Sequence, residues 1–109
     1  MSAFVRVCRT AEIPPGHAAR VDIDAIPVAI FNVGGEFFAL DDTCSHAMAS
    51  LSEGELDLGR CAVECPLHGS QFDLRSGAPL SLPAVDGVGV HAVEVRDDEL
   101  WVALSPPPG

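Results

Sequence analysis

The stretches that decide the fold of this chain are Cys44-Ser45-His46 and Cys65-Pro66-Leu67-His68-Gly69-Ser70. Each stretch places a thiol two or three residues before an imidazole, and eighteen residues separate the two pairs. Two soft sulfur donors and two imidazole nitrogens form a ligand set that transition metals prefer in proteins. The sequence therefore predicts a metal centre built by two segments that converge in space.

The order of the ligands bears on which metal the centre holds. A zinc site of two Cys and two His is tetrahedral and closed, and zinc fingers usually pair Cys with Cys and His with His. Here each stretch mixes one Cys with one His. Mixed pairs make sense if one metal takes both thiolates and a second takes both imidazoles. A site that holds a single zinc ion is the alternative at this point.

The pattern Cys-x-His followed by Cys-x-x-His-Gly-Ser resembles the two cluster-binding loops of the Rieske iron–sulfur domain. The resemblance extends over roughly residues 35–104. It implies an all-β fold with an antiparallel β-sandwich base, a small cluster-binding subdomain and one 2Fe-2S cluster. By this resemblance Cys44 and Cys65 hold the inner iron, and His46 and His68 hold the outer iron near the surface.

The same resemblance implies a set of residues around the ligands: Gly69, Ser70, Phe72 and Pro83. Ser70 matches a serine that bonds a bridging sulfide. Phe72 stands where high-potential respiratory members have a Tyr that donates a hydrogen bond to a ligand sulfur. Those members also carry a disulfide between the loops, and the matching positions here are Ala49 and Leu67. Hydrogen bonds to sulfur stabilise the reduced state and so raise the reduction potential. Because Phe72 offers no such hydrogen bond, we expect a low reduction potential.

The charge of the centre sets the range in which that potential falls. Two ferric irons, two sulfides and two thiolates sum to zero, whereas four thiolates would leave two negative charges. A neutral centre accepts an electron more easily. Rieske centres as a class span about −150 to +300 mV, against about −400 mV for all-cysteine plant-type ferredoxins. The expected potential lies toward the bottom of the Rieske range.

Length and composition favour a single β domain. The chain has 109 residues, 48% of them hydrophobic, which suits one domain with a modest core and argues against disorder. Alternating apolar residues and turn signals predict strands at 4–7, 18–23, 27–33, 36–40, 60–64, 72–74, 91–96 and 99–104. Gly34-Gly35 and Asp97-Asp98 are expected hairpin turns. We expect one Rieske domain over residues 1–109.

Within that domain, the cluster-binding loops are expected at about 41–84 and a Pro-rich tail at 105–109. The acidic segment 53–59 is interpreted as a turn, and 78–84 as an irregular loop. Cys61 alternates with Val63 along the predicted 60–64 strand, so it is interpreted as a buried core thiol and not a ligand. Cys8 is likewise expected to be a buried thiol. His17 is interpreted as solvent-exposed and His91 as structural.

Charge narrows the possible partners. The formal net charge is −10, with no Lys and six Arg against sixteen acidic residues. Such a surface repels nucleic acid and anionic membranes and favours a partner with a basic docking face. No apolar run reaches the roughly 18 residues that span a bilayer, and the N-terminal residues lack the apolar run of a signal peptide. We expect a cytoplasmic monomer.

The resemblance also implies a function. It points to the soluble ferredoxin of a bacterial ring-hydroxylating dioxygenase system, used in aromatic hydrocarbon catabolism. Such a ferredoxin carries one electron from an NAD(P)H-dependent flavoprotein reductase to a terminal non-haem iron oxygenase, and it is not an enzyme by itself. Two alternatives stay open: the small Rieske-like subunit of an assimilatory nitrite reductase, and a structural zinc-binding module.

Overall fold

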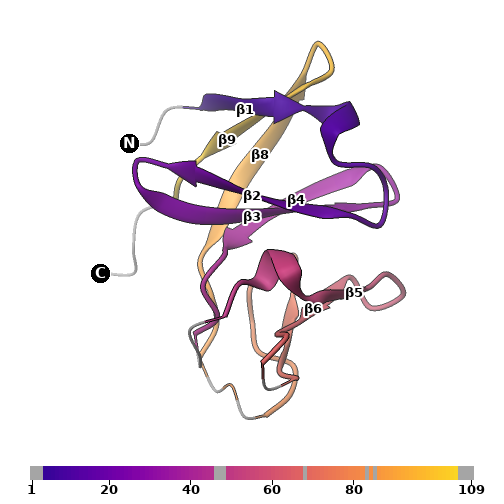
Figure 1. Cartoon of the computed structure of the whole chain (residues 1–109), viewed down its shortest axis with the longest axis vertical. Helices are drawn as coiled ribbons and strands as arrows, with labels where there is room; N and C mark the ends of the chain where they lie inside the picture. Colours follow the sequence, from indigo (N-terminus) through magenta and orange to yellow (C-terminus); the bar gives the residue numbers. More distant parts are fainter. Residues whose placement is uncertain (1–3, 46–48, 68, 83, 85, 106–109) are drawn as a thin grey trace.

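A six-stranded antiparallel sheet forms the upper part of the molecule in Figure 1. The computed structural model describes residues 4–45, 49–67, 69–82, 84 and 86–105. The strands lie in the order β1-β9-β8-β4-β3-β2. Their bounds are Val5–Arg9 (β1), Ala18–Ile23 (β2), Ile26–Val33 (β3), Glu36–Asp41 (β4), Val90–Arg96 (β8) and Glu99–Ala103 (β9). We call this sheet the base.

A second, three-stranded sheet lies below the base in Figure 1. Its strands are antiparallel and comprise Glu55–Asp57 (β5), Ala62–Glu64 (β6) and Gln71–Asp73 (β7). Short 3-10 helices span Thr10–Glu12 (η1) and Leu51–Glu53 (η2). In sequence the small sheet lies between β4 and β8, which pair with each other in the base. The predicted all-β fold, with a base and a small subdomain, is confirmed.

Strand β3 explains how the two parts share their cores. Its residues alternate between faces, as side chains of a strand do. Val28 and Ile30 pack into a core within the base, together with Ile13, Ile23, Ala39, Leu100 and Val102. Ala29 and Phe31 face the opposite way and join a second core that reaches into the small sheet. Because both faces of β3 are covered, the small sheet is packed firmly on the base.

Tight turns set the register of the base hairpins. Gly34 and Gly35 have φ angles of 61° and 95°, and Asp97 and Asp98 have φ angles of 50° and 62°. Both predicted hairpin turns are therefore confirmed. A further two-residue turn, Asp24-Ala25 with φ angles of 51° and 66°, joins β2 to β3 and was not predicted. Its Asp tolerates this backbone region, whereas its Ala gives no turn signal.

Two details of the sequence analysis are wrong. The acidic segment 53–59 is not simply a turn, because it contains β5, in which Leu56 pairs with Val63. Cys61 is buried as predicted, at 5% exposure, but it lies in the turn before β6 with a φ of 52°. Three-residue strands are too short to show a clear alternation, so the two adjacent hairpins that join β5, β6 and β7 give no periodic signal in the sequence.

No helix among the described residues has the length and apolar character needed to cross a membrane.

Candidate metal centre

The first ligand loop, residues 42–51, is a narrow closed loop at the end of β4. Its ends are joined because the Leu51 N–H donates to the Asp42 carbonyl at 2.7 Å. Further in, the Cys44 N–H donates to the Ala49 carbonyl at 3.0 Å. The Asp42 side chain is 1% exposed and its Oδ1 accepts the Ser52 N–H at 2.9 Å. The buried carboxylate thus fixes η2 against the strand end that leads into Cys44.

The second ligand loop, residues 65–70, joins β6 to β7 by a tight turn. The Cys65 N–H donates to the Ser70 carbonyl at 2.7 Å, and the Gly69 N–H donates to the Cys65 carbonyl at 3.0 Å. Gly69 has a φ of 76°, a conformation that glycine adopts at little cost. The turn therefore needs a glycine where the Cys-x-x-His-Gly-Ser pattern places one.

The two loops bring both predicted cysteine ligands into one buried core. Cys44 is 5% exposed and Cys65 is 1% exposed, and both belong to the core shared with Phe31 and Phe72. Burial alone does not mark them as ligands, because Cys61 is buried in the same core. A shared position in one core does suit two thiolates that bind one metal centre.

The predicted histidine ligands, His46 and His68, lie outside the described residues. Within the part of the chain that the structure describes, no group of three or more His, Cys, Asp or Glu side chains could hold a metal ion. Ser45 and Leu67, which directly precede the histidines, are exposed. Each predicted cysteine ligand is therefore buried, whereas the residue that directly precedes each predicted histidine ligand is exposed.

Residues predicted around the ligands are placed as follows. Ser70 is fully buried and its Oγ accepts the Ala84 N–H at 3.0 Å, which leaves the hydroxyl hydrogen free to donate elsewhere. Phe72 is fully buried in the core that holds the cysteines. Pro83 lies outside the described residues.

A third segment, residues 78–88, contacts both ligand loops. The sequence analysis interpreted 78–84 as an irregular loop and placed only Pro83 from it around the ligands. The segment runs beside β7, where the Leu80 N–H donates to the Gln71 carbonyl at 2.6 Å. It also reaches the first ligand loop, since the Ser45 hydroxyl donates to the Asp86 carbonyl at 2.6 Å. The signal in the sequence was the pair of glycines at its ends, Gly77 and Gly87, which approach each other too closely for a Cβ.

The other two cysteines have the properties of inert thiols. Burial raises the pKa of the Cys61 thiol above its ordinary value, which favours the neutral form. Cys8, which was expected to be buried, is only half-buried, and it lies in β1 at the edge of the base. Burial and the nearby Glu12 carboxylate raise the pKa of its thiol in the same direction. Both shifts favour the neutral thiol over the thiolate that a metal ligand needs.

Comparison with known proteins gives the family. Residues 3–97 match the family described as the Rieske 2Fe-2S domain. This chain belongs to the Rieske family. Its cofactor is one Rieske 2Fe-2S cluster, and the paired buried cysteines described above fit that group.

Similar Rieske proteins are ferredoxins of multicomponent dioxygenases. The 3-phenylpropionate/cinnamic acid dioxygenase ferredoxin subunit of Shigella flexneri serotype 5b (strain 8401) is 43% identical over 100 residues, which are 92% of either chain. The ferredoxin of carbazole 1,9a-dioxygenase from Nocardioides aromaticivorans IC177 matches with a TM-score of 0.91 at 36% identity, over 94% of this chain and 99% of that one.

A further solved structure is a complex of reduced oxygenase and oxidised ferredoxin in carbazole 1,9a-dioxygenase. It matches with a TM-score of 0.84 at 44% identity, over 92% of both chains. The prediction of a Rieske ferredoxin of the ring-hydroxylating type, an electron-transfer component and not an enzyme alone, is confirmed. A chain described as an NADH-dependent nitrite reductase small subunit from Mycobacterium tuberculosis shares the fold, with a TM-score of 0.85 at 25% identity over 97% of this chain and 98% of that one.

Proposed function

We propose that this Rieske protein carries single electrons from an NAD(P)H-dependent flavoprotein reductase to the terminal oxygenase of a ring-hydroxylating dioxygenase system. Its cluster is held by Cys44, His46, Cys65 and His68. The observation that carries the proposal is the convergence of two closed loops that bury both cysteines in one core. The similar dioxygenase ferredoxins support the choice of partners.

The protein's own residues explain why it acts as a carrier. A bound 2Fe-2S cluster stores and releases one electron. With four ligands from the chain, the centre has no open position for a substrate. Cys44 and Cys65 hold the inner side in a core without solvent access, while the exposed Ser45 and Leu67 keep the outer side at the surface. The outer side, with His46 and His68, is the proposed exit for the electron.

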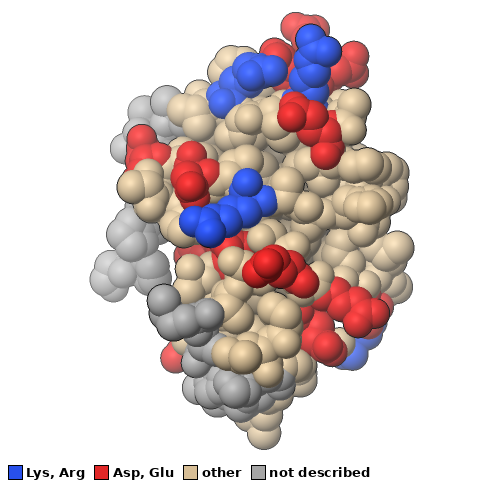
Figure 2. Space-filling model, viewed as in Figure 1, with Lys and Arg blue, Asp and Glu red and all other residues tan. Residues whose placement is uncertain are grey.

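The surface around the ligand loops suits brief docking. Leu67, Leu80 and Leu82 are 59%, 42% and 77% exposed, which is high for large apolar side chains. In Figure 2 the described surface at the lower end of the view is mainly uncharged, with acidic side chains beside it. An apolar contact flanked by acids favours fast association with a basic partner, and salt weakens that association.

Reconstitution tests the proposal. The purified protein should be red-brown, should lose visible absorbance on reduction by dithionite, and should restore NADH-dependent dioxygenase turnover to a mixture of reductase and oxygenase that lacks a ferredoxin. His68→Ala should abolish both the visible spectrum and the turnover. A colourless protein with one bound zinc per chain would show that the centre is not an iron–sulfur cluster.

The nitrite reductase small subunit is retained as a second candidate because a chain with that description shares the fold at a TM-score of 0.85. Nitrite-dependent NADH oxidation that requires this chain would favour it over the dioxygenase function. We further propose that residues 1–109 form one domain that acts as a monomer in the cytoplasm. A molecular mass of about 11.4 kDa by light scattering would support the monomer.

A further inference from the structure

A polar groove of about 400 Å³ lies between the first ligand loop and the residues that lead into β8. We call it the acceptor groove. It is lined by Asp41, Thr43, Ser45, Gly87, Val88 and Gly89. The groove adjoins the proposed exit for the electron, because Ser45 directly precedes the predicted ligand His46.

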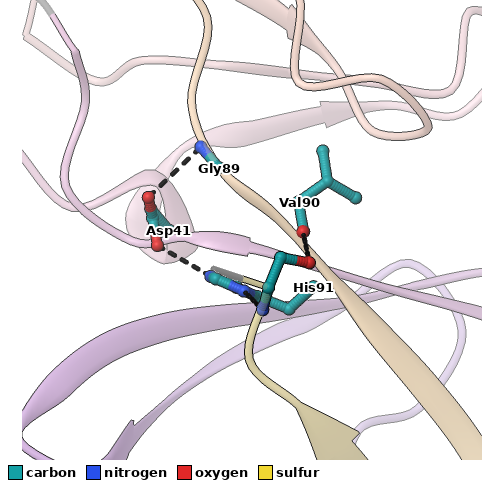
Figure 3. Close-up of polar contacts among 5 residues, drawn as sticks. Asp41, Gly89, Val90 and His91 are labelled. Atoms are coloured by element: carbon teal, nitrogen blue, oxygen red, sulfur yellow. Dashed lines mark hydrogen bonds and ion pairs between the residues drawn. The ribbon is translucent and has the colours of Figure 1, made fainter. Parts of the chain in front are cut away.

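The Asp41 side chain in this groove is held in a fixed position (Figure 3). Its Oδ1 lies 2.7 Å from His91 Nε2, and its Oδ2 accepts the Gly89 N–H at 3.2 Å. The Asp41 N–H also donates to the Gly89 carbonyl at 2.9 Å. A side chain that is already ordered in this way loses little conformational freedom when a partner binds it.

The glycine at position 89 makes this arrangement possible. A Cβ on Gly89 would lie 2.5 Å from Asp41 Oδ2, so any side chain there would displace the carboxylate. The Asp41 side chain is still 41% exposed in spite of its bonds. A carboxylate has about four acceptor sites, and the contacts with His91 and Gly89 use two of them. Asp41 therefore keeps acceptor sites for a partner.

No arginine or lysine of the chain neutralises this carboxylate. The chain has no lysine, and all six arginines lie within the described residues. None of these six forms an ion pair with Asp41, because those that form ion pairs do so with carboxylates of the base strands. The other polar side chains of the groove are hydroxyls. The Ser45 hydroxyl gives its hydrogen to the Asp86 carbonyl at 2.6 Å, so its oxygen can act as an acceptor in the groove.

We propose that the acceptor groove binds an arginine side chain of the terminal oxygenase when the two proteins dock. A guanidinium has five N–H donors and no acceptor, and its planar fork can bond both oxygens of one carboxylate. It therefore matches a groove that offers a fixed carboxylate and hydroxyl oxygens. The net charge of −10 also favours a basic partner surface.

The choice of the oxygenase rests on the proposed function. The groove lies beside the exit for the electron, so an arginine seated there brings the surface of the electron acceptor close to the cluster. The reductase, which would supply the electron, is the alternative occupant that the experiment must exclude.

The experiment compares Asp41→Asn with Asp24→Asn in the protein that contains the cluster. Both substitutions remove one negative charge, so they change the overall attraction to a basic partner equally. Asp24 is exposed in the turn between β2 and β3, with a φ of 51° that Asn tolerates. The Kd for the purified oxygenase and for the purified reductase is measured at several salt concentrations. Urea unfolding and the visible spectrum check that each variant is folded and holds its cluster.

Thr43→Arg is a second test that leaves Asp41 and its bonds intact. Thr43 is exposed and lines the acceptor groove, so an arginine at this position would pair with Asp41 within the chain and exclude the arginine of the partner. Thr43→Gln is the matched control, because it places a long neutral side chain at the same position.

Asp41→Asn should raise the Kd for the oxygenase about fivefold to tenfold and make it less dependent on salt, whereas Asp24→Asn should change it less than about twofold. Thr43→Arg should weaken binding by a similar factor, and Thr43→Gln should weaken it less than about threefold. Substitution of one oxygenase arginine by Gln should weaken binding to the parent and have no further effect on Asp41→Asn.

Equal effects of the two Asp substitutions, or of the two Thr43 substitutions, would overturn the acceptor groove. A loss of affinity for the reductase alone would overturn the assignment to the oxygenase. Failure of the proposed function has a different signature, because the parent protein itself would then not pass electrons to the oxygenase. If the parent does so and the variants bind as tightly as the parent, the acceptor groove alone is wrong.

Discussion

The Nε2 atom of His91 lies 2.7 Å from Oδ1 of Asp41, and this pair ties the start of β8 to the end of β4 just before the first ligand loop (Figure 3). The Ser105 N–H donates to His91 Nδ1 at 3.0 Å, so Nδ1 is an acceptor and Nε2 carries the hydrogen that goes to Asp41. The second oxygen of Asp41 accepts the Gly89 N–H at 3.2 Å. The predicted structural role of His91 is confirmed, since it is 8% exposed and bonded on both sides.

Replacing this histidine should destabilise the protein. His91→Ala removes two hydrogen bonds, one to Asp41 and one from the Ser105 N–H. Each contributes about 0.5–1.5 kcal/mol, so the free energy of unfolding should fall by about 1–3 kcal/mol. Urea unfolding followed by the fluorescence of Trp101, the single tryptophan, measures it. His17→Ala is the matched control, because His17 is exposed and its loss should change stability by less than about 0.5 kcal/mol. Equal effects of the two substitutions would contradict the role assigned to His91.

Most strands of the base follow from local patterns in the sequence. The run from Pro27 to Phe31 is continuously apolar because β3 is covered on both faces, and the flanking turns carry Gly or Asp. The loops that hold Cys44 and Cys65 were also evident, because ligand spacing is a local property of the sequence.

The features that escaped prediction depend on which residues pair, and not on a periodic pattern along the chain. Strand β5 pairs with β6 through Leu56 and Val63, and the segment 78–88 is placed by bonds such as that from Ser45 to Asp86. A hydroxyl or a backbone carbonyl has no sequence signature that names its partner. Cys61 was placed correctly in the core but assigned to a strand, because a residue of positive φ next to a three-residue strand gives no periodic signal.

Gly77 should not accept any side chain. Gly77→Ala must hold a φ of 73° and place a Cβ 2.2 Å from the Val88 carbonyl oxygen, so the backbone at the two ends of segment 78–88 has to move. We expect a loss of more than about 3 kcal/mol in stability, together with a poor yield of protein that contains the cluster. Gly35→Ala is the control, since Gly35 has a φ of 95° but nothing within 4 Å of the added carbon. Gly35→Ala should lower the free energy of unfolding by about 1–2 kcal/mol, which is the cost of the left-handed backbone conformation alone. Similar losses for both variants would show that the close approach at Gly77 is relieved cheaply.

Removing the cluster should disorder the ligand loops and spare the base. The base has its own core around Val28, Ile30 and Leu100, which does not include either ligand cysteine. In the His68→Ala protein, or after acid and chelator treatment, Trp101 in β9 should keep its native emission while amide protection at Cys65 and Ser70 is lost. Hydrogen exchange and fluorescence on the same samples measure both. If Trp101 instead showed the emission of the unfolded protein once the cluster is removed, the base and the small sheet would fold only together.

The two cysteines outside the site should be poor nucleophiles. Burial raises the pKa of Cys61 and of Cys8, so the reactive thiolate is scarcer at pH 8 than for a free cysteine. Alkylation by iodoacetamide should therefore be slow in the folded protein, should speed up as the pH rises, and should become fast in urea. Because burial favours the neutral thiol, its contribution to stability is present below pH about 8.5 and is lost as the pH rises further. Cys8→Ser identifies which thiol reacts, and rapid labelling of Cys61 in the native state would contradict the burial.

Phe72 should keep the reduction potential low. Its ring is fully buried in the core that contains Cys44 and Cys65, and it has no donor to offer a sulfur ligand. Phe72→Tyr adds a hydroxyl at the position where high-potential members carry one. A hydrogen bond that favours the reduced centre by about 1 kcal/mol raises a one-electron potential by roughly 40 mV.

The parent midpoint should lie toward the bottom of the range of about −150 to +300 mV, and a value well above zero would contradict the low-potential assignment. Protein-film voltammetry of the parent, Phe72→Tyr and Phe38→Tyr separates the hydrogen bond from the general effect of an added hydroxyl. Phe38 lies in β4, packs against the same core from a partly buried position and is not among the residues predicted around the ligands, so its tyrosine variant should leave the midpoint unchanged. If Phe72→Tyr also leaves it unchanged while the cluster spectrum is intact, the absent hydroxyl does not set the potential, and the absent disulfide becomes the remaining difference from the high-potential members.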